Sequence, residues 1–381
     1  MKAYQDASLA PVRRAKALLE EMTLAEKIGQ LNQRLYGFRI YERKCVNGED
    51  TIELSEEFCQ EVEKYSGLGV LYGLYRADPW ADKNYETGLT GVLSKKAYNQ
   101  VQRYVLEHSR LGIPVMMSSE CPHGHQALDG YLLPVNLLAG ATFDPAMVRA
   151  AYRVSGRQLQ NMGVDLALMS MLDVLRDPRW GRSEECYSED PYLSARMAEA
   201  AVIGMQESGP EVVAKHFAAQ GEGTGGVNAS AARIGERELR EIHFPPAAAA
   251  IKAGAKGIMA AYNEIDGVYC HANRWLLNDV IRKEMGFDGI VMSDGVAIDQ
   301  LDSMTGDNVV SGALALQSGV DVGLWDEAFG KLEEAVRRGL VKEAQIDQAV
   351  LRVLTLKFER GLFEHPYLEE EGEIHLSLIH I

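Results

Sequence analysis

Short apolar runs alternate with amphipathic stretches along the chain from about residue 68 onward. Uniformly apolar runs are typical of strands that are buried on both faces of a parallel sheet. The stretches between them have the apolar spacing of helices. Repeated strand–helix units of this kind predict an α/β fold with a mainly parallel sheet. The eight predicted strands are GVLYG near residue 70, IPVMMSSE from Ile113, LLAGATF from Leu137, VDLALMSMLDV from Val164, VVAKHFAA from Val212, AKGIMAAYN from Ala255, GIVMSDG from Gly289 and VDVGLW from Val320.

Capping residues mark the ends of the intervening helices. Thr23 and Glu26 form a capping-box pattern ahead of a periodic apolar stretch, so a helix is expected to begin there. Asp144-Pro145 and Asp190-Pro191 each supply an N-cap followed by a proline at the first helical position, and Gly163 ends the helix that Asp144 starts. These boundaries support the count of strand–helix units.

Polar residues follow several predicted strands at the point where each strand would pass into its loop. In a closed barrel the carboxyl ends of the strands converge on one face around a single pocket, whereas in an open sheet they spread along a line. We therefore favour a (β/α)8 TIM-type barrel over a doubly wound sheet. The residues concerned are Glu120, Asp173, Lys215 with His216, Tyr262 with Asn263, and Asp294.

The length and composition fit one large domain. The chain has 381 residues, of which 46% are hydrophobic, and this is enough to bury a substantial core. No internal repeat or Pro/Gly-rich linker divides the region of strand–helix units. We expect residues 1–365 to form a single barrel domain and residues 366–381 to form a linker or a truncated tail.

The charge and the cysteines exclude several classes of protein. A net charge of -16 argues against nucleic acid or an anionic membrane as a partner, because binding phosphates requires clustered Lys and Arg. The start of the chain has no continuous apolar stretch that could be a signal sequence or a membrane span, so we expect a cytoplasmic protein. The five cysteines have no CxxC spacing, which predicts neither a disulfide framework nor a zinc ribbon.

Asp294 is the most informative carboxylate because it ends a fully apolar predicted strand. A buried, unpaired carboxylate is costly, so Asp294 should either cap the following helix or line a polar pocket. Lys215 and His216 end a second strand, and Arg182 lies in a third strand-to-loop region. Cations beside a carboxylate keep it ionised and can donate hydrogen bonds to sugar hydroxyls. Such a group of residues is suited to a glycosidase nucleophile.

The sequence also resembles a known family. Four successive segments are similar to signature blocks of glycoside hydrolase family 3, and MTLAEKIGQL and VLTLKFERGLFEHPY resemble the beginning and end of that family's barrel. The resemblance spans nearly the whole chain in the right order. The four segments are RDPRWGRSEECYSEDPYL, VVAKHFAAQGEGTGGVN, IGERELREIHFPPAAAAIKAGAKGIMAAYNEIDG and GFDGIVMSDG.

The resemblance implies a retaining exo-β-glycosidase without a metal or cofactor, acting on a β-glycoside or oligosaccharide. In such enzymes one carboxylate attacks the anomeric carbon while an acid protonates the leaving oxygen. The family's nucleophile falls on Asp294, in the SD motif. Its sugar-binding positions fall on Glu120 in ExxHG, Arg182 in WGR, Lys215 and His216 in KHF, and Tyr262 in AYN. We expect Tyr262 to lie near the nucleophile and to orient it.

Three departures from the family's pattern change what we expect. Gly295 follows the nucleophile where an aromatic residue is common, so a stacking surface for sugar is either absent or supplied from elsewhere. The Asp-x-His dyad of the family's hexosaminidases is missing from Gly221–Asn228, which disfavours N-acetylglucosaminidase activity. Members without that dyad take their general acid from a second, αβα sandwich domain.

We expect that second domain to be absent, because the chain ends soon after HPYLEEEGE. The acid/base residue would then lie outside this chain, and natural disaccharides would be poor substrates. The closing IHLSLIHI is either the start of a further strand or a foreign sequence. Without the second domain, the barrel surface that it would cover is exposed. We expect this surface to favour self-association into a homo-oligomer.

Two other functions are possible interpretations of the sequence: one uses a different set of residues, and the other follows from the absence of a general acid. A metal-dependent hydrolase on a barrel would use an HxH pair with further His, Lys and Asp residues at strand ends. A barrel that binds sugar without hydrolysing it is the non-enzymatic alternative. Within the family, we place β-glucosidase first and β-xylosidase second. The residues that suggest the metal site are His123, His125, Lys215, His216, His271 and Asp294.

Overall fold

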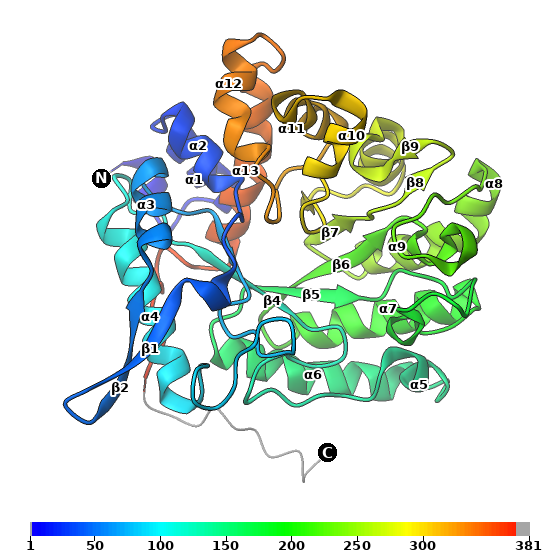
Figure 1. Cartoon of the computed structure of the whole chain (residues 1–381), viewed down its shortest axis with the longest axis horizontal. Helices are drawn as coiled ribbons and strands as arrows, with labels where there is room; N and C mark the ends of the chain where they lie inside the picture. The colour runs from blue at the N-terminus through cyan, green and yellow to red at the C-terminus, as the bar shows by residue number, and fades with distance from the viewer. Residues whose placement is uncertain (1, 371–381) are drawn as a thin grey trace.

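A curled parallel sheet forms the centre of the molecule in the computed structural model, which describes residues 2–370 (Figure 1). Nearly all residues of its strands are buried, as the uniformly apolar runs predict. Within the described residues the sheet has six strands. In order across the sheet they are β10 (Ile290–Met292), β7 (Gly257–Ala260), β6 (Glu211–Phe217), β5 (Leu166–Ser170), β4 (Met116–Glu120) and β3 (Val70–Tyr72).

Residues 320–325 continue the sheet beyond β10. The amide of Ser293 donates to the carbonyl oxygen of Val322 (2.8 Å), and the amide of Asp321 donates to the carbonyl oxygen of Val291 (2.8 Å). Met292 and Val322 also form a parallel bridge. The predicted strand VDVGLW therefore lies in the barrel wall, although it pairs through only a few hydrogen bonds.

Residues 31–36 close the ring between that segment and β3. The amides of Gly323 and Trp325 donate to the carbonyl oxygens of Leu31 and Gln33 (2.9 Å each). On the other side, a parallel bridge joins Tyr36 to Tyr72 of β3. Across the described residues, eight wall segments thus surround one axis. This arrangement confirms the TIM-type barrel that the sequence predicts.

One predicted strand is wrong. The apolar run from Leu137 lies in helix α5 (Asn136–Gly140) and the turn after it, and the wall segment at residues 31–36 takes its place in the ring. Leu137 and Leu138 are exposed rather than buried between layers. A short apolar run cannot be assigned to strand or helix from periodicity alone. Residues 31–36 escape prediction because Asn32, Gln33 and Arg34 interrupt any apolar run.

Helices surround the sheet, and the predicted caps hold their amino ends. Thr23 and Glu26 form a capping box, and the side chains of Asp144 and Asp190 accept hydrogen bonds from amides of the first turn. The main helices are α1 (Pro11–Leu19), α2 (Leu24–Gln30), α3 (Glu56–Tyr65), α4 (Gly91–Glu107), α6 (Pro145–Asn161), α7 (Pro191–Gln206), α9 (Phe244–Lys252), α11 (Asn308–Ser318), α12 (Leu332–Arg337) and α13 (Glu343–Glu359), with a π-helical segment at Trp275–Glu284.

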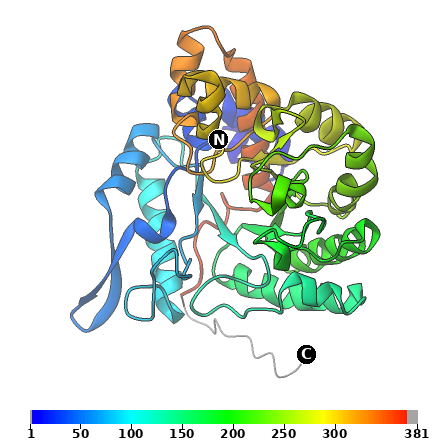
Figure 2. The same ribbon diagram turned by 45° about the vertical axis from the view of Figure 1, so that its right-hand side comes forward.

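Two features lie outside the regular pattern of strand–helix units. An antiparallel hairpin, β1 (Tyr41–Val46) with β2 (Glu49–Leu54), projects from the barrel in two views (Figures 1 and 2). At the other end of the chain, the backbone of Leu368 exchanges hydrogen bonds with the side chain of Asn99 in α4. Part of the expected tail, residues 371–381, lies outside the described residues. Among residues 2–370, no helix is both long and apolar enough to cross a membrane.

Lys357 of α13 is a fully buried lysine that ties three segments together near the amino ends of the strands. Its ammonium donates to Gln30 Oε1 (2.6 Å) and to the carbonyl oxygens of Pro114 (2.7 Å) and Leu68 (3.4 Å). Burial lowers the pKa of Lys357 to about 7, and the charge of Asp165 opposes that shift in part. Removing this donor leaves buried acceptors without a partner.

We therefore predict that Lys357→Met lowers the free energy of unfolding by about 1–3 kcal/mol for each acceptor left unpaired. Urea unfolding followed by circular dichroism measures the change. Lys252→Met is the matched control, because Lys252 is exposed in the last turn of α9 and should change stability by less than about 0.5 kcal/mol. Equal stability of the two variants would show that the buried ammonium does not support the barrel.

Candidate active site

Asp294 lies two residues after the end of β10 and is only 8% exposed. Its Oδ1 accepts a hydrogen bond from the amide of Gly295 (2.8 Å), and its own amide donates to Nε2 of His271 (3.1 Å). Its Oδ2 has no hydrogen-bond partner within residues 2–370. The backbone around this carboxylate is thus held while one oxygen is left for a ligand.

His271 contacts the backbone of the nucleophile candidate, Asp294. It follows β9 (Val268–Tyr269) and is fully buried, and burial lowers its pKa to about 4. A neutral imidazole can accept the Asp294 amide proton through Nε2, which an imidazolium cannot do. Our sequence analysis named His271 only as a candidate metal ligand, and its contact with the Asp294 backbone was not expected.

His216, at the end of β6, stands between two carboxylates. Its Nδ1 lies 2.7 Å from Asp173 Oδ2, and its Nε2 lies 3.7 Å from Asp294 Oδ2. Asp173 also accepts hydrogen bonds from the amides of His216 and Gly221 (3.2 Å each). The carboxylate of Asp173 therefore fixes the ring orientation and directs Nε2 toward Asp294.

Arg182 approaches the same imidazole from the loop after β5. Its guanidinium makes two hydrogen bonds to Glu185 (2.7 and 2.9 Å), and its Nη2 lies 3.1 Å from His216 Nε2. Burial alone would raise the pKa of Glu185, but the Arg182 guanidinium outweighs it and lowers the pKa to about 2. Glu185 and then Asp294 raise the pKa of Arg182. Glu185 was not predicted, and its bidentate geometry is the kind that orients an arginine firmly.

Glu120 and Lys215 form a second buried pair beside this group. Lys215 Nζ donates to Glu120 Oε2 (2.7 Å), and the hydroxyl of Tyr72 donates to Glu120 Oε1 (3.1 Å). Burial would raise the pKa of Glu120, but Lys215 and Arg76 together hold it below its ordinary value. The carboxylate of Glu120 is therefore favoured in its ionised form, and it has hydrogen-bonding capacity left for hydroxyl groups.

Tyr262 lies near the nucleophile but contacts the next residue. Its hydroxyl donates to the carbonyl oxygen of Gly295 (2.8 Å). Burial and the charge of Asp294 raise the pKa of Tyr262, so the hydroxyl keeps its proton. Tyr262 thus holds the backbone that follows Asp294 and lies beside the carboxylate, and its orienting role stays a prediction.

The barrel brings all the predicted site residues into one region. Contacts link His216 to Asp294, Arg182 and Asp173, the charges of Lys215 and His216 lower the pKa of Glu185, and Tyr262 lies against Gly295. Asp173 stood among the strand-end polar residues in the sequence, which was the signal for it. Glu185 and His271 gave no comparable signal, because neither ends a predicted strand.

The residues that suggested a metal site do not form a metal-binding set. His125 is buried, its Nε2 lies 2.9 Å from Ser119 Oγ, and burial lowers its pKa to about 4. No set of three or more His, Cys, Asp or Glu side chains among the described residues could hold a metal ion together. His125 is thus accounted for by its buried contact after β4.

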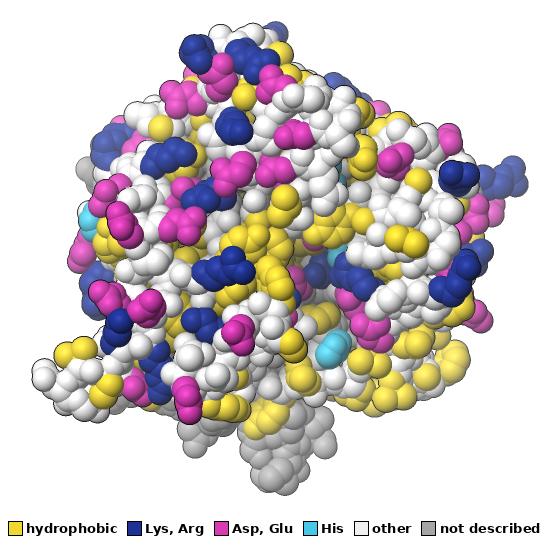
Figure 3. All heavy atoms as spheres, in the orientation of Figure 1, with side chains coloured by type: hydrophobic (Ala, Val, Ile, Leu, Met, Phe, Trp, Pro, Cys, Tyr) yellow, Lys and Arg dark blue, Asp and Glu magenta, His cyan; other side chains and the backbone are white. Residues whose placement is uncertain are grey.

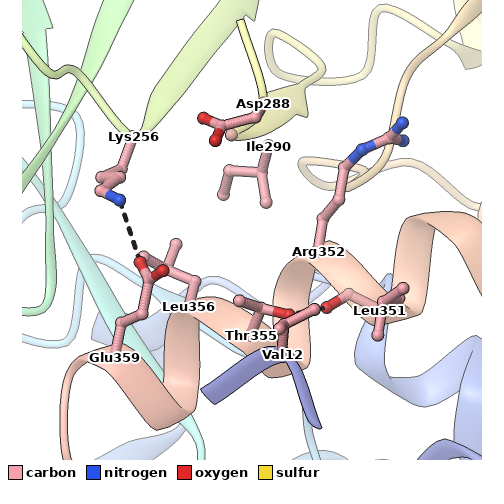
Figure 4. A pocket seen from close by; sticks show the side chains of 10 residues that line it. Val12, Lys256, Asp288, Ile290, Leu351, Arg352, Thr355, Leu356 and Glu359 are labelled. Carbon is pink, nitrogen blue, oxygen red and sulfur yellow. Dashed lines mark hydrogen bonds and ion pairs between the residues drawn. The ribbon is translucent and has the colours of Figure 1, made fainter. Parts of the chain in front are cut away.

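A separate pocket of about 300 Å³ lies at the opposite end of the strands (Figure 4). Its lining includes Asp288 and Lys256, which precede β10 and β7, and Glu359 of α13, which pairs with Lys256 at 3.0 Å. Catalytic groups of TIM barrels gather at the carboxyl ends of the strands. This pocket is therefore not the candidate site.

Comparison with known proteins agrees with this geometry. Residues 23–356 match the family described as the Glycosyl hydrolase family 3 N terminal domain. The chain is 32% identical to a periplasmic beta-glucosidase of Salmonella typhimurium, covering 92% of this chain and 42% of that protein. It is 33% identical to a beta-xylosidase of Formosa agariphila, over 76% of this chain and 43% of that protein.

Solved structures give the same result. A β-glucosidase from Erythrobacter marinus has a TM-score of 0.84 at 32% identity, covering 97% of this chain and 48% of that one. A mutant beta-glucosidase from Listeria innocua, in complex with laminaribiose, has a TM-score of 0.79 at 31% identity, covering 93% of this chain and 47% of that one. This chain thus spans about half the length of the relatives it matches.

The match covers most of the chain, and the strand-end carboxylate, its cations and the barrel occur in the order that the sequence motifs predicted. The chain belongs to glycosyl hydrolase family 3, with residues 23–356 forming that family's N-terminal domain.

Proposed function

We propose that Asp294 is the nucleophile of a retaining exo-β-glycosidase. The observation that supports this best is the state of its carboxylate: buried, beside Arg182 and His216, with Oδ2 unpaired within the described residues. Nearby positive charge keeps a carboxylate ionised, and a free oxygen can approach an anomeric carbon. An Asp that merely capped a helix would not need the Arg182 guanidinium beside it.

The surrounding charged pairs are suited to the nonreducing terminal sugar. Glu120 accepts and Lys215 and Arg182 donate hydrogen bonds, so together they match vicinal hydroxyls that both donate and accept. Asp173 and Glu185 keep His216 and Arg182 in place when no sugar is bound. Preorganised groups of this kind lose little entropy when the substrate binds.

In the first step, Oδ2 of Asp294 attacks the anomeric carbon and the bond to the leaving oxygen breaks, giving a glycosyl ester and an alcohol. The leaving oxygen takes a proton from a general acid. In the second step, water attacks the same carbon, the ester bond breaks, and the acid regains a proton from that water. Two inversions at one carbon retain its β configuration.

The neighbouring carboxylates are poor candidates for the acid. The pKa values of Glu120 and Glu185 lie below their ordinary range, and Asp173 accepts three hydrogen bonds. A general acid must hold a proton near the working pH. We propose that the proton donor is a group outside residues 2–370.

β-Glucosides are the substrates we place first, and β-xylosides are the alternative. Relatives of both names match this chain at similar identity, so the ratio of rates on the two nitrophenyl glycosides decides between them. A sugar-binding protein without turnover would bind glucose or xylose and release no nitrophenol from either substrate.

Asp294→Ala should reduce release of nitrophenol from the preferred nitrophenyl β-glycoside by several orders of magnitude, because no other carboxylate has a free oxygen at the end of β10. The matched control is Asp288→Ala, an exposed Asp before the same strand that should keep full activity. Mass spectrometry after a 2-fluoro-sugar inactivator should find the label on Asp294. Label on another residue would exclude the assignment.

The dependence of kcat/KM on the leaving group tests whether this chain lacks a general acid. We expect this chain to favour nitrophenyl β-glycosides over cellobiose or xylobiose by about 10²- to 10⁴-fold in kcat/KM, because a nitrophenolate leaves without protonation. The measurement is kcat/KM for a series of aryl glycosides whose phenols differ in pKa. We expect log kcat/KM to fall steeply as the pKa of the phenol rises. A flat plot together with full activity on disaccharides would mean that the acid lies within this chain.

A further inference from the structure

Gly295, directly after the nucleophile candidate, is explained by the space around it. Its φ is not in the left-handed region, so the backbone does not require glycine there. A Cβ atom at this position would lie 2.5 Å from both Cε3 and Cζ3 of Trp325, and 3.2 Å from the hydroxyl oxygen of Tyr262. The indole ring of Trp325 thus occupies the room that a side chain at residue 295 would need.

The backbone holds Trp325 in that position against its own preference. Its φ is +63°, a conformation that costs a bulky residue about 1–3 kcal/mol. Its amide donates to the carbonyl oxygen of Gln33 (2.9 Å). The next residue, Asp326, accepts hydrogen bonds from the hydroxyl of Ser293 (2.6 Å) and from three amides, those of Leu324, Ile298 and Asp299. These bonds join the loop that bears Trp325 to the loop that bears Asp294.

Trp325 belongs to an aromatic wall, which we define as Tyr36, Trp80 and Trp325. The ring of Trp325 stacks on Tyr36 (centroids 4.7 Å apart, 27° between planes) and lies 5.1 Å from Trp80. It also meets the ring of Tyr72 edge-on at 4.8 Å, and the Tyr72 hydroxyl donates to Glu120. The wall therefore reaches from the residue after Asp294 to the Glu120–Lys215 pair.

The wall lies at the mouth of the site and the charged pairs lie deeper. Trp80 is 46% exposed and Tyr36 and Trp325 are half-buried, whereas Lys215 and His216 are 5% and 1% exposed. Figure 3 shows hydrophobic side chains near the middle of the face drawn, beside basic side chains and a hollow. A terminal sugar held by the buried charges would leave the rest of the substrate at the outer, aromatic side.

We propose that Trp325, backed by Tyr36 and Trp80, is the surface on which the leaving group of the substrate stacks, and that Gly295 is small so that this ring can lie beside the nucleophile. The ligand class is a β-linked sugar or aryl group with a flat apolar face. The proposal rests on the proposed glycosidase function, because that function requires the charged pairs to hold the terminal sugar and so fixes the orientation of the substrate. Contacts of this kind use the π face of the indole and the C–H face of a pyranose.

The test measures binding, so it does not depend on turnover. Phenyl 1-thio-β-glucoside and methyl 1-thio-β-glucoside share the terminal sugar and differ only in the leaving group, and both resist hydrolysis. Calorimetric titration of the intact chain gives the ratio of their Kd values. In the wild type, the phenyl compound should bind tighter by about 5- to 10-fold, which is the scale of one aromatic contact.

Trp325→Ala should bring this ratio close to 1 while the Kd of the methyl compound changes less than about 2-fold. Trp325→Phe, which keeps an aromatic ring, should retain part of the preference. Trp80→Ala, at a more exposed position, should lower the ratio without affecting folding. It keeps the proposal testable if Trp325→Ala does not fold. Tyr192→Ala, at a 73% exposed tyrosine of α7, is the control that should leave the ratio unchanged.

A side chain at position 295 and the Trp325 ring cannot occupy the same space, and this steric conflict gives a second test. Gly295→Trp alone should weaken binding of both compounds, because its side chain collides with the Trp325 ring. The double variant Gly295→Trp/Trp325→Ala should recover binding of the methyl compound and part of the phenyl preference. An unchanged ratio in Trp325→Ala and Trp80→Ala, or a double variant no better than Gly295→Trp, would overturn the proposal.

The outcomes separate this inference from the proposed function. Loss of the phenyl preference in a protein that releases nitrophenol supports both. Turnover of nitrophenyl glycosides with a phenyl preference that is independent of the wall refutes the inference alone. Failure of the wild type to bind either thioglucoside or either of the matching thioxylosides refutes the proposed function, and with it the inference.

Discussion

The structure around Asp294 depends on compensating a charge that is almost removed from water. At 8% exposure, an ionised carboxylate has lost most of its hydration, and only nearby cations and donors can replace it. The guanidinium of Arg182 supplies positive charge for this compensation. Arg182 and His216 are each paired with their own carboxylate, Glu185 or Asp173. The resulting alternation of charges keeps every side chain in one orientation. The guanidinium of Arg182 also lowers the pKa of Glu185, which makes Glu185 poorly suited to donate a proton.

This alternation requires a closed barrel. Asp173, His216 and Asp294 lie at the ends of three different strands, and Arg182 and Glu185 come from one loop. Only the curvature of the wall brings these positions together at one end of the axis. The closure itself uses little regular sheet, since residues 31–36 and 320–325 pair through only a few hydrogen bonds and isolated bridges.

The two ends of the barrel use buried charge differently. At the amino ends, Lys357 reaches three acceptors, and Asp321 accepts from Arg282 (2.6 Å) and Arg352 (2.7 Å), so that each charge is satisfied within the fold. At the carboxyl ends, one oxygen of Asp294 is left without a partner among the described residues. Complete pairing supports stability, and the incomplete pairing at the other end is what a ligand can complete.

Much of this protein could be predicted from the sequence because the relevant signals are local. Uniform apolar runs predict buried parallel strands, capping residues predict helix starts, and the strand-end position of Asp294 within its motif predicts the candidate nucleophile. Glu120, Arg182, Lys215, His216 and Tyr262 were found in the same way, through motifs that each lie within a few residues.

Other features were decided only by the tertiary structure, because they depend on contacts between distant segments. The pairing of Arg182 with Glu185, the support of Asp294 by His271, and the use of residues 31–36 as barrel wall have no local pattern that distinguishes them from ordinary loops. The run at Leu137 shows the converse, since its hydrophobicity fits a strand and its surroundings make it a helix. Gly295 is the clearest case: the sequence shows a missing side chain, and only the fold shows that Trp325, thirty residues further on, fills the space.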